Sequence, residues 1–268
     1  MGKIIVITGA SAGIGLSLAK MLDNGENKIY AASRKGETGF VGKNIEPVSL
    51  DVNNEQSLNA FAAKIADENG RVDVLVCNAG NGIGGSVEDM KMDEIRYQME
   101  TNFFGAVNTI KAFLPLMRRQ NFGKIIVTGS VAGVVPIPFQ SVYSASKAAV
   151  MTFTDALSLE LKPYNIQCCC ILPGDTKTNF TAARKIAANA ENTASPYLEK
   201  FKNSIAKMEK DEQNGAPPEK VAQQIVNQIN KKTMKKRVVP GLDYKLICWA
   251  FGWLPQRLKL WIVGMLYA

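Results

Sequence analysis

A tyrosine and a lysine four residues apart, Tyr143 and Lys147, could do acid–base chemistry in this chain. They fall in the segment 142–161, whose pattern predicts a long helix, and residues four apart share one helical face. The ammonium can therefore approach the phenol, favour the phenolate and lower the tyrosine pKa from its usual value of about 10. Such a pair could exchange protons with a substrate near neutral pH, although the same spacing is also common in solvated surface pairs.

A glycine-rich segment follows the first predicted strand and opens a predicted helix. It covers residues 8–15 and has glycines at Gly9, Gly13 and Gly15. Glycines at such a place let the backbone turn tightly and approach a pyrophosphate at the helix N-terminus, where free N–H groups favour an anion. The segment therefore predicts a dinucleotide site, with a plain glycine-rich turn as the alternative.

The composition excludes several other kinds of site. The 268 residues include no histidine, so an imidazole-driven nucleophile and a histidine-ligated metal are excluded, and we expect no metal site. The five cysteines include three consecutive ones, which cannot staple distant loops, so we expect a reduced protein of the cytoplasm. Eight basic residues but only one acidic residue lie from Lys231 onward, so nearly all of the net charge of +8 is there and the rest of the chain is close to neutral. This distribution argues against a diffuse nucleic-acid-binding surface.

The elements that must position these residues alternate between short apolar runs and longer helical patterns. Such alternation predicts βαβ units, and hence an α/β fold with a Rossmann-type, doubly wound parallel sheet of about seven strands in one domain, residues 1–241. The predicted strands are 4–8, 28–33, 46–50, 72–77, 124–128, 166–172 and 237–239, and the predicted helices are 13–24, 56–68, 92–119, 142–161 and 217–230. Residues 175–215 are polar and weakly helical, and we expect them to form a substrate-binding loop region.

With the glycine-rich loop and the tyrosine–lysine helix in this order, the chain resembles the short-chain dehydrogenase/reductase family over roughly residues 3–240. Further matching residues, each after a strand or in a helix, are Asn78, Ala79, Gly80, Asn102, Ser130, Pro173, Gly174, Thr176 and Thr178. Cys77 departs from the family, which usually has asparagine there, at a position that we expect to be structural.

The resemblance implies four catalytic residues. Tyr143 would donate a proton to the substrate oxygen during reduction, or remove it during oxidation. Lys147 would lower the Tyr143 pKa and hold the nicotinamide ribose, while Ser130 would orient the reacting oxygen. Asn102 would hold a water that links Lys147 to solvent. This chemistry needs neither histidine nor metal.

The resemblance also implies a cofactor site, and the residues after the second strand indicate which cofactor. Position 33 is serine and position 34 is arginine, an arrangement that accommodates a 2′-phosphate, so we predict NADP(H). Asp51 and Val52 look like the pair that contacts the adenine. The implied cofactor-binding residues are Gly9, Ser11, Gly13, Ile14, Gly15, Ser33, Arg34, Asp51, Val52, Asn78, Ala79, Gly80, Tyr143, Lys147, Pro173, Gly174, Thr176 and Thr178.

Several stretches, including 112–118, 131–136, 195–197 and 218–222, look like the 17β-hydroxysteroid-dehydrogenase-like branch of the family. That branch implies interconversion of a secondary alcohol and a ketone on a steroid-like or other lipid substrate. The alternatives are a reductase of fatty-acyl, sphingoid or small polar carbonyls, and a non-catalytic NADP-binding member. Apolar residues at Val134, Val135, Ile137 and Phe139 would suit a lipid, or would pack on the neighbouring helix.

The C-terminal tail, residues 242–268, holds all three tryptophans together with lysine and arginine. This mixture is typical of an interfacial segment that contacts an anionic membrane surface. A lid over the site or a dimer contact would use the same aromatic residues. No apolar run of 18 residues is present, so no span is predicted. The resemblance implies a homodimer or homotetramer formed through the helices 92–119 and 142–161.

Overall fold

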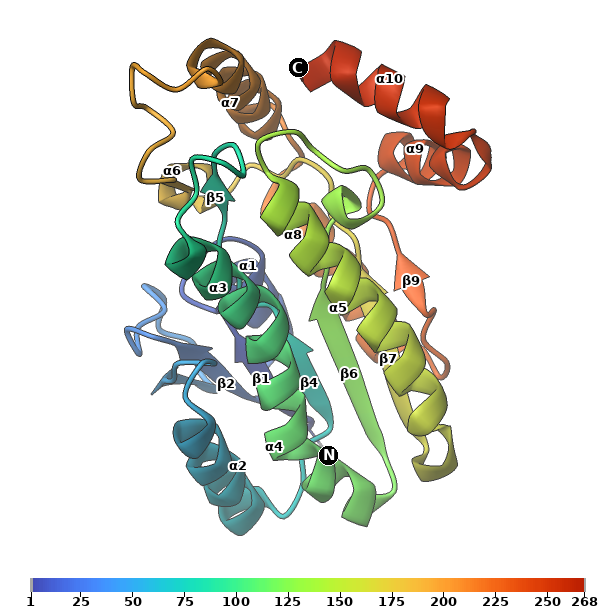
Figure 1. Cartoon of the computed structure of the whole chain (residues 1–268). Coiled ribbons are helices and arrows are strands. Elements are labelled where there is room, and N and C mark those ends of the chain that lie inside the picture. The colour runs from blue at the N-terminus through green and yellow to red at the C-terminus, as the bar shows by residue number, and fades with distance from the viewer. Residues whose placement is uncertain (1, 268) are drawn as a thin grey trace.

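A seven-stranded parallel sheet forms the centre of the computed structural model, which describes residues 2–267 (Figure 1). The strands lie in the order β3-β2-β1-β4-β6-β7-β9, so the strand order reverses direction between β1 and β4. Such a reversal leaves a crevice at the carboxyl ends of the strands, where ligands bind in open α/β sheets. The strands are β1 (Ile4–Thr8), β2 (Lys28–Ser33), β3 (Ile45–Ser49), β4 (Val74–Cys77), β6 (Gly123–Thr128), β7 (Ile166–Ile171) and β9 (Arg237–Val238). The predicted Rossmann-type fold is confirmed.

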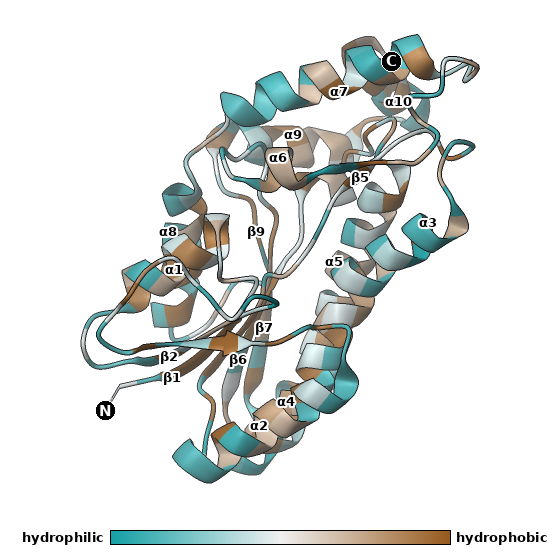
Figure 2. Cartoon of the chain, turned by 90° about the vertical axis from the view of Figure 1, so that its left-hand side faces the viewer, coloured by the Kyte–Doolittle hydropathy of each residue, from teal (hydrophilic) through white to brown (hydrophobic). Residues whose placement is uncertain are grey.

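Helices cover both faces of this sheet because its central strands are apolar on both sides (Figure 2). On β1, Ile5 and Ile7 point to one face and pack with α1 (Gly13–Leu22) and α8 (Pro218–Asn230). Val6 points to the other face, which α2 (Glu55–Asn69), α4 (Gly105–Gln120) and α5 (Ser141–Glu160) cover. These two layers make the fold rigid beneath the crevice.

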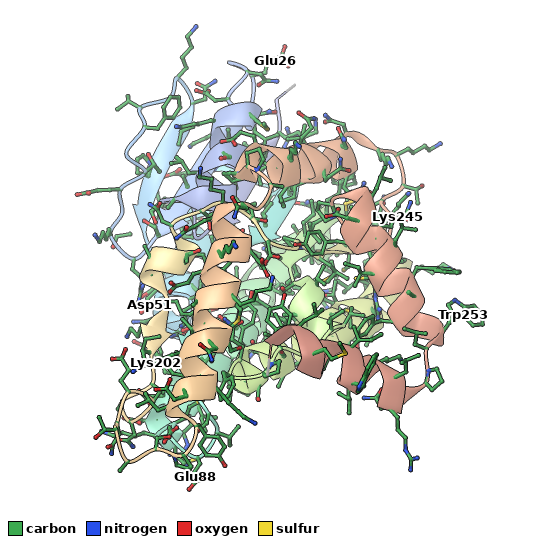
Figure 3. The ribbon with its side chains drawn as sticks, turned by 90° about the horizontal axis from the view of Figure 1, so that it is seen from above. Glu26, Asp51, Glu88, Lys202, Lys245 and Trp253 are labelled. Carbon is green, nitrogen blue, oxygen red and sulfur yellow. The ribbon has the colours of Figure 1, made fainter. Side chains whose placement is uncertain are left out.

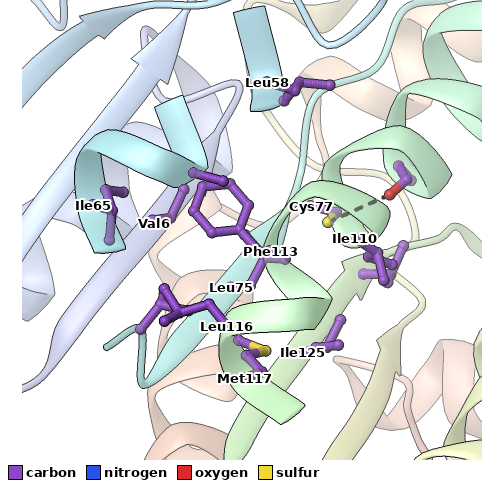
Figure 4. Packing of buried hydrophobic residues seen from close by; sticks show 14 of the residues in the cluster. Val6, Leu58, Ile65, Leu75, Cys77, Ile110, Phe113, Leu116, Met117 and Ile125 are labelled. Carbon is purple, nitrogen blue, oxygen red and sulfur yellow. Dashed lines mark hydrogen bonds between the residues drawn. The ribbon is translucent and has the colours of Figure 1, made fainter. Parts of the chain in front are cut away.

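The second layer contains the cluster drawn in Figure 4, where Phe113 of α4 is fully buried among aliphatic side chains. Cys77, at the end of β4, belongs to this cluster, and its thiol donates to the carbonyl of Ala106 at 4.0 Å. Burial raises the pKa of the Cys77 thiol, so it stays protonated. The residue that departs from the family pattern is therefore a core residue.

The predicted continuous helix 92–119 is wrong in one respect. It consists of α3 (Met92–Met99), a π-helical turn η1 (Glu100–Phe104) and α4. A π-turn places one extra residue in the helix and is frequent at functional sites. Here the extra residue changes the direction of the side chains between α3 and α4, and Asn102 lies inside the turn.

The region 175–215 is more regular than predicted. It contains α6 (Phe180–Ala183), α7 (Leu198–Gln213) and β8 (Lys185–Ile186), which pairs in parallel with β5 (Ile83–Gly84). The tail folds into α9 (Leu242–Trp253) and α10 (Gln256–Tyr267), which lie with α7 above the carboxyl edge of the sheet (Figures 1 and 2). None of the helices within residues 2–267 is both long and apolar enough to cross a membrane.

Candidate active site

A cavity of about 530 Å³ lies at the carboxyl edge of the sheet. All of the predicted site residues line this cavity except Gly15 and Asn102, which lie beneath its wall. The predicted residues that line it are Gly9, Ser11, Gly13, Ile14, Ser33, Arg34, Asp51, Val52, Asn78, Ala79, Gly80, Ser130, Tyr143, Lys147, Pro173, Gly174, Thr176 and Thr178. The fold therefore brings residues from six strand ends to one place.

The glycine-rich loop forms a tight cradle at one end of the cavity. Gly9 has a φ of 68°, in the left-handed region that favours glycine, and a Cβ there would lie 2.8 Å from the Cα of Ala79. A Cβ on Gly15 would lie 2.4 Å from the carbonyl oxygen of Gly9, so Gly15 allows α1 to pack against the loop. No side chain caps the N-terminus of α1. Its first N–H groups and helix dipole therefore suit a pyrophosphate, and the loop fits a dinucleotide.

Asn78 holds three strand ends together beneath this loop. Its side-chain nitrogen donates to the carbonyls of Thr8 and Gly9 at 3.3 and 3.1 Å. Its Oδ1 accepts from the hydroxyl of Thr128 at 3.1 Å. Because β1, β4 and β6 are joined in this way, the position of the cradle is fixed relative to the residues that follow β6.

The end of β2 offers a cation and no carboxylate at positions 33 and 34. Ser33 is buried and donates to the carbonyl of Glu37, while Arg34 is exposed and lines the cavity. The Arg34 guanidinium donates to the hydroxyl of Tyr97 at 3.0 Å, and Tyr97 also lines the cavity. Tyr97 is 63 residues away in the sequence, and no local pattern identified it. Together these groups suit a phosphate on the adenosine ribose.

Ser130, Tyr143 and Lys147 meet on the opposite side of the cavity. Ser130 precedes the 3₁₀ turn η2 (Val131–Gly133), accepts from the backbone N–H of Ala132 at 3.0 Å and is hydrogen-bonded to the hydroxyl of Tyr143. The Lys147 Nζ donates to the carbonyl of Thr128 at 2.9 Å and lies 5.8 Å from the centre of the Tyr143 ring. A serine, a phenol and an ammonium thus face one volume.

The expected lowering of the Tyr143 pKa by Lys147 is wrong for this structure. Burial raises the pKa of Tyr143 to about 12, opposed by its hydrogen bond with Ser130, and Lys147 is not among the largest causes of this shift. Burial also lowers the pKa of Lys147 to about 8. The lysine ammonium is turned toward the Thr128 carbonyl, which explains why its effect on the phenol is small. Tyr143 is therefore protonated at neutral pH and is ready to donate.

Asn102 lies behind this group and is 2% exposed. From the π-turn its Oδ1 accepts from the N–H of Asn81 at 2.8 Å, and its Nδ2 donates to the Asn81 carbonyl and the Ser146 hydroxyl, both at 3.0 Å. A Cβ on Gly80 would lie 3.2 Å from the Asn102 Oδ1 and 3.5 Å from the Lys147 Nζ, so both groups crowd this glycine. The role of Asn102 in holding a water stays a prediction.

The upper wall of the cavity is apolar. The sequence predicted a lipid-contacting loop at 134–139 and a lid formed by the tail as alternatives, but it did not identify Phe180. Phe180 of α6 packs against Tyr143 with 5.7 Å between ring centres. Val135 and Ile137 line the cavity, whereas Val134 and Phe139 pack in the protein interior, so both interpretations of that loop apply. The tail adds the side chains Ile247, Phe251, Ile262, Val263, Leu266 and Tyr267. An apolar substrate would be in contact with these residues.

Two carboxylates interrupt this apolar wall. Asp175 accepts from the hydroxyl of Tyr244 on α9, and burial raises the pKa of the Asp175 carboxyl. Glu212 accepts from the Thr181 hydroxyl at 2.6 Å and forms an ion pair with the buried Arg184. Both carboxylates line the cavity and act on Tyr143 electrostatically, each raising its pKa.

Comparisons with known proteins agree with this geometry. Residues 3–189 match the family model described as short chain dehydrogenase. A 3-ketodihydrosphingosine reductase of Bacteroides thetaiotaomicron is 40% identical over 99% of this chain and 98% of its own length. The human 17-beta-hydroxysteroid dehydrogenase type 1 is 36% identical over 66% of this chain and 58% of its own length.

A solved structure shares most of this architecture. The crystal structure of a short-chain dehydrogenase from Streptomyces avermitilis has a TM-score of 0.82 and is 28% identical, covering 93% of this chain and 91% of that one. The sheet order agrees with the family pattern that the sequence predicted, and the glycine-rich loop and the Ser130, Tyr143 and Lys147 group line one cavity at its edge. The chain belongs to the short-chain dehydrogenase/reductase family, whose members are oxidoreductases that bind a nicotinamide cofactor.

Proposed function

We propose that this protein is an NADPH-dependent reductase that interconverts a ketone and a secondary alcohol on a lipid substrate. The observation that carries the proposal is the single cavity that joins the Ser130, Tyr143 and Lys147 group to an apolar wall. An apolar wall of this kind suits a hydrocarbon chain or ring system, while the polar group at its base suits a carbonyl oxygen. A non-catalytic role would not require all of Asn102, Ser130, Tyr143 and Lys147.

The residues at the cradle fit the cofactor, whose nicotinamide supplies the hydride when it is bound. Gly9 and Gly13, with the uncapped start of α1, would hold the pyrophosphate, and Arg34 with Tyr97 would hold a 2′-phosphate. Asp51 lies at the end of β3 and would contact the adenine. Arg34 and the absence of a carboxylate at position 33 support NADP(H) over NAD(H).

The chemistry assigned to the chain is proton transfer and orientation. Tyr143 and Ser130 would both donate to the substrate carbonyl oxygen, which fixes its position and polarises the carbonyl. Because the Tyr143 pKa is about 12 here, the phenol carries the proton that the developing alkoxide takes up. Lys147, with a pKa of about 8, is mostly charged at pH 7 and would hold the nicotinamide ribose.

Within the lipids, we favour a long-chain keto base. The relative that covers nearly all of this chain is named for 3-ketodihydrosphingosine, in which an ammonium group neighbours the ketone carbon. Asp175 lines the cavity and would favour a cation near the reacting oxygen, whereas the charge of Glu212 is paired with Arg184. A hydroxysteroid is the second candidate, supported by the human relative over residues that cover 66% of the chain.

The experiment is NADPH oxidation with 3-ketodihydrosphingosine, estrone and a short acetoacetyl thioester, each also measured with Tyr143→Phe. Turnover of the keto base that the substitution abolishes would support the proposal and its substrate. Turnover of estrone alone would assign the steroid class. Turnover of none of the three, with NADPH still binding, would contradict an active lipid reductase and favour the non-catalytic alternative.

We further propose that the protein is a homo-oligomer. A monomer mass measured by light scattering would contradict this proposal.

A further inference from the structure

The two tail helices carry apolar side chains on opposite faces. Their inner faces line the cavity through residues such as Phe251 and Val263, which are 8% and 4% exposed. Their outer faces carry apolar residues at helical spacing, and these are largely in solvent. The outer residues are Leu242, Leu246, Trp249 and Trp253 on α9, and Leu258, Trp261 and Met265 on α10.

The exposure of the tryptophans is unusually high for such large apolar side chains. Trp249, Trp253 and Trp261 are 67%, 79% and 60% exposed. Figure 3 shows Trp253 projecting from the end of α9 away from the body of the molecule. A helix of a soluble protein normally turns one apolar face inward and a polar face outward. Because the inward faces of α9 and α10 already line the cavity, their outer apolar stripes need a different apolar surface or layer to cover them.

The charges beside these stripes indicate which phase. Lys245 and Arg257 are exposed on the tail helices, and Asp243 is the only acidic residue in α9 and α10. Basic side chains between tryptophan and leucine suit the anionic headgroup region of a bilayer, where their stems can lie along the apolar layer. A second copy of this chain would bring the same cations against one another, which would weaken a self-contact.

Two other basic residues of the C-terminal region, Lys231 and Lys232, do not belong to this surface. Lys231 and Lys232 lie at the amino ends of β6 and β7, where their carbonyls accept hydrogen bonds from the side chains of Lys124 and Gln167. That edge of the sheet is opposite to the cavity. The cationic character of the tail face therefore comes from the helices themselves, and the lysines at 231 and 232 offer an internal control.

We propose that α9 and α10 form a membrane-docking hairpin that lies in the surface of an anionic bilayer with Trp249, Trp253 and Trp261 in the headgroup region. The same hairpin forms the wall of the active-site cavity, so docking brings the cavity wall to the lipid layer. A long-chain substrate then passes from the bilayer to Tyr143 without crossing water. The docking stands on the surface of the hairpin alone, whereas the delivery of substrate rests on the proposed function.

The test is co-sedimentation of the full chain with vesicles of phosphatidylcholine, with and without phosphatidylglycerol. We expect binding to the anionic vesicles, and a blue shift of tryptophan emission on binding. Trp253→Gln with Trp261→Gln should weaken the partitioning about tenfold or more. The matched control replaces two exposed apolar residues away from the tail, Phe122→Gln and Leu159→Gln, and should bind as the wild type does.

Two double variants with the same change in net charge separate docking of the tail from a general attraction between a cationic protein and an anionic vesicle. Lys245→Glu with Arg257→Glu should weaken binding about tenfold or more, because each basic residue near an anionic surface contributes to the affinity. Lys231→Glu with Lys232→Glu changes the net charge equally and should leave it nearly unchanged. Equal losses from both pairs would overturn a docking surface on the tail.

Two further results would overturn the proposal. The first is a full chain that stays in the supernatant with both kinds of vesicle. The second is a tail variant that lowers the mass by light scattering while the wild type ignores vesicles, which would make this face a contact between copies. Tyr143→Phe should bind vesicles as the wild type does, so a failure of the proposed reaction and a failure of docking are distinguishable.

Discussion

The replacement of Lys147 by methionine should increase the stability of this protein while abolishing its activity. Lys147 is buried, and burial lowers its pKa from 10.5 to about 8. That fall corresponds to about 3 kcal/mol by which the folded state disfavours the charged form. Methionine has a similar length and no charge, so it removes this cost. It also removes the hydrogen bond to the Thr128 carbonyl, worth about 1 kcal/mol. We expect a net gain of about 2 kcal/mol at pH 7.

The stability difference between the wild type and Lys147→Met should depend on pH. The folded pKa of Lys147 lies below the unfolded value, so the unfolded chain binds more protons between about pH 8 and pH 10.5. The free energy of unfolding of the wild type therefore rises through this window, relative to the variant. The advantage of Lys147→Met should be full below pH 8 and should disappear by about pH 10.5.

Urea denaturation of the wild type and Lys147→Met at pH 7 and pH 10 measures the effect. The control is Tyr143→Phe, which keeps the lysine and should show a nearly constant difference from the wild type between these two pH values. The reasoning is refuted if Lys147→Met is less stable than the wild type by the same amount at both pH values. That result would mean that the ammonium is well solvated or well paired in the folded protein.

Three further predictions concern the reaction and the cofactor. Tyr143→Phe should lower kcat about 10² to 10⁴-fold with little change in NADPH affinity, measured by fluorescence titration; an unchanged kcat would exclude the phenol as the acid. Arg34→Glu should move the ratio of kcat/KM for NADPH and NADH at least about tenfold toward NADH; an unaltered ratio would mean that Arg34 does not contact the cofactor. Gly9→Ala should lower the free energy of unfolding by about 1–3 kcal/mol and weaken NADPH binding, because the new Cβ would collide with Ala79 and the residue would have to keep a positive φ. Gly39→Ala, at a φ of 60° with open space around it, is the matched control and should leave NADPH binding intact.

The sequence alone determined the sheet and most of the cavity lining. Short apolar runs separated by helical patterns specify parallel strands, and parallel strands place everything that follows them at one edge. Gly9, Asn78, Ser130 and Pro173 therefore had to approach one another wherever the individual strands began and ended. The pairing of Tyr143 with Lys147 on one helical face was equally local, because it depends only on the helical repeat.

Only the tertiary structure decided the features that depend on burial and on contacts between distant segments. The lowering of the Tyr143 pKa expected from the spacing does not occur, since the phenol is buried and Lys147 turns to the Thr128 carbonyl. The contact of Arg34 with Tyr97 joins two segments that no repeat relates. The π-turn at Asn102 is fixed by hydrogen bonds to Asn81 and Ser146 rather than by a helix pattern.

In the tail, the sequence determined the kind of segment, whereas only the tertiary structure decided which residues are exposed. Its composition indicated an aromatic and basic segment, with a lid, a dimer contact and a membrane surface all open. Which face of each helix would be covered could not be read from composition, because α9 is apolar on nearly every side. Packing over the cavity buried Phe251 and Val263 and left Trp249, Trp253 and Trp261 outside. Local patterns fix which residues share a face, but only the rest of the fold decides what that face meets.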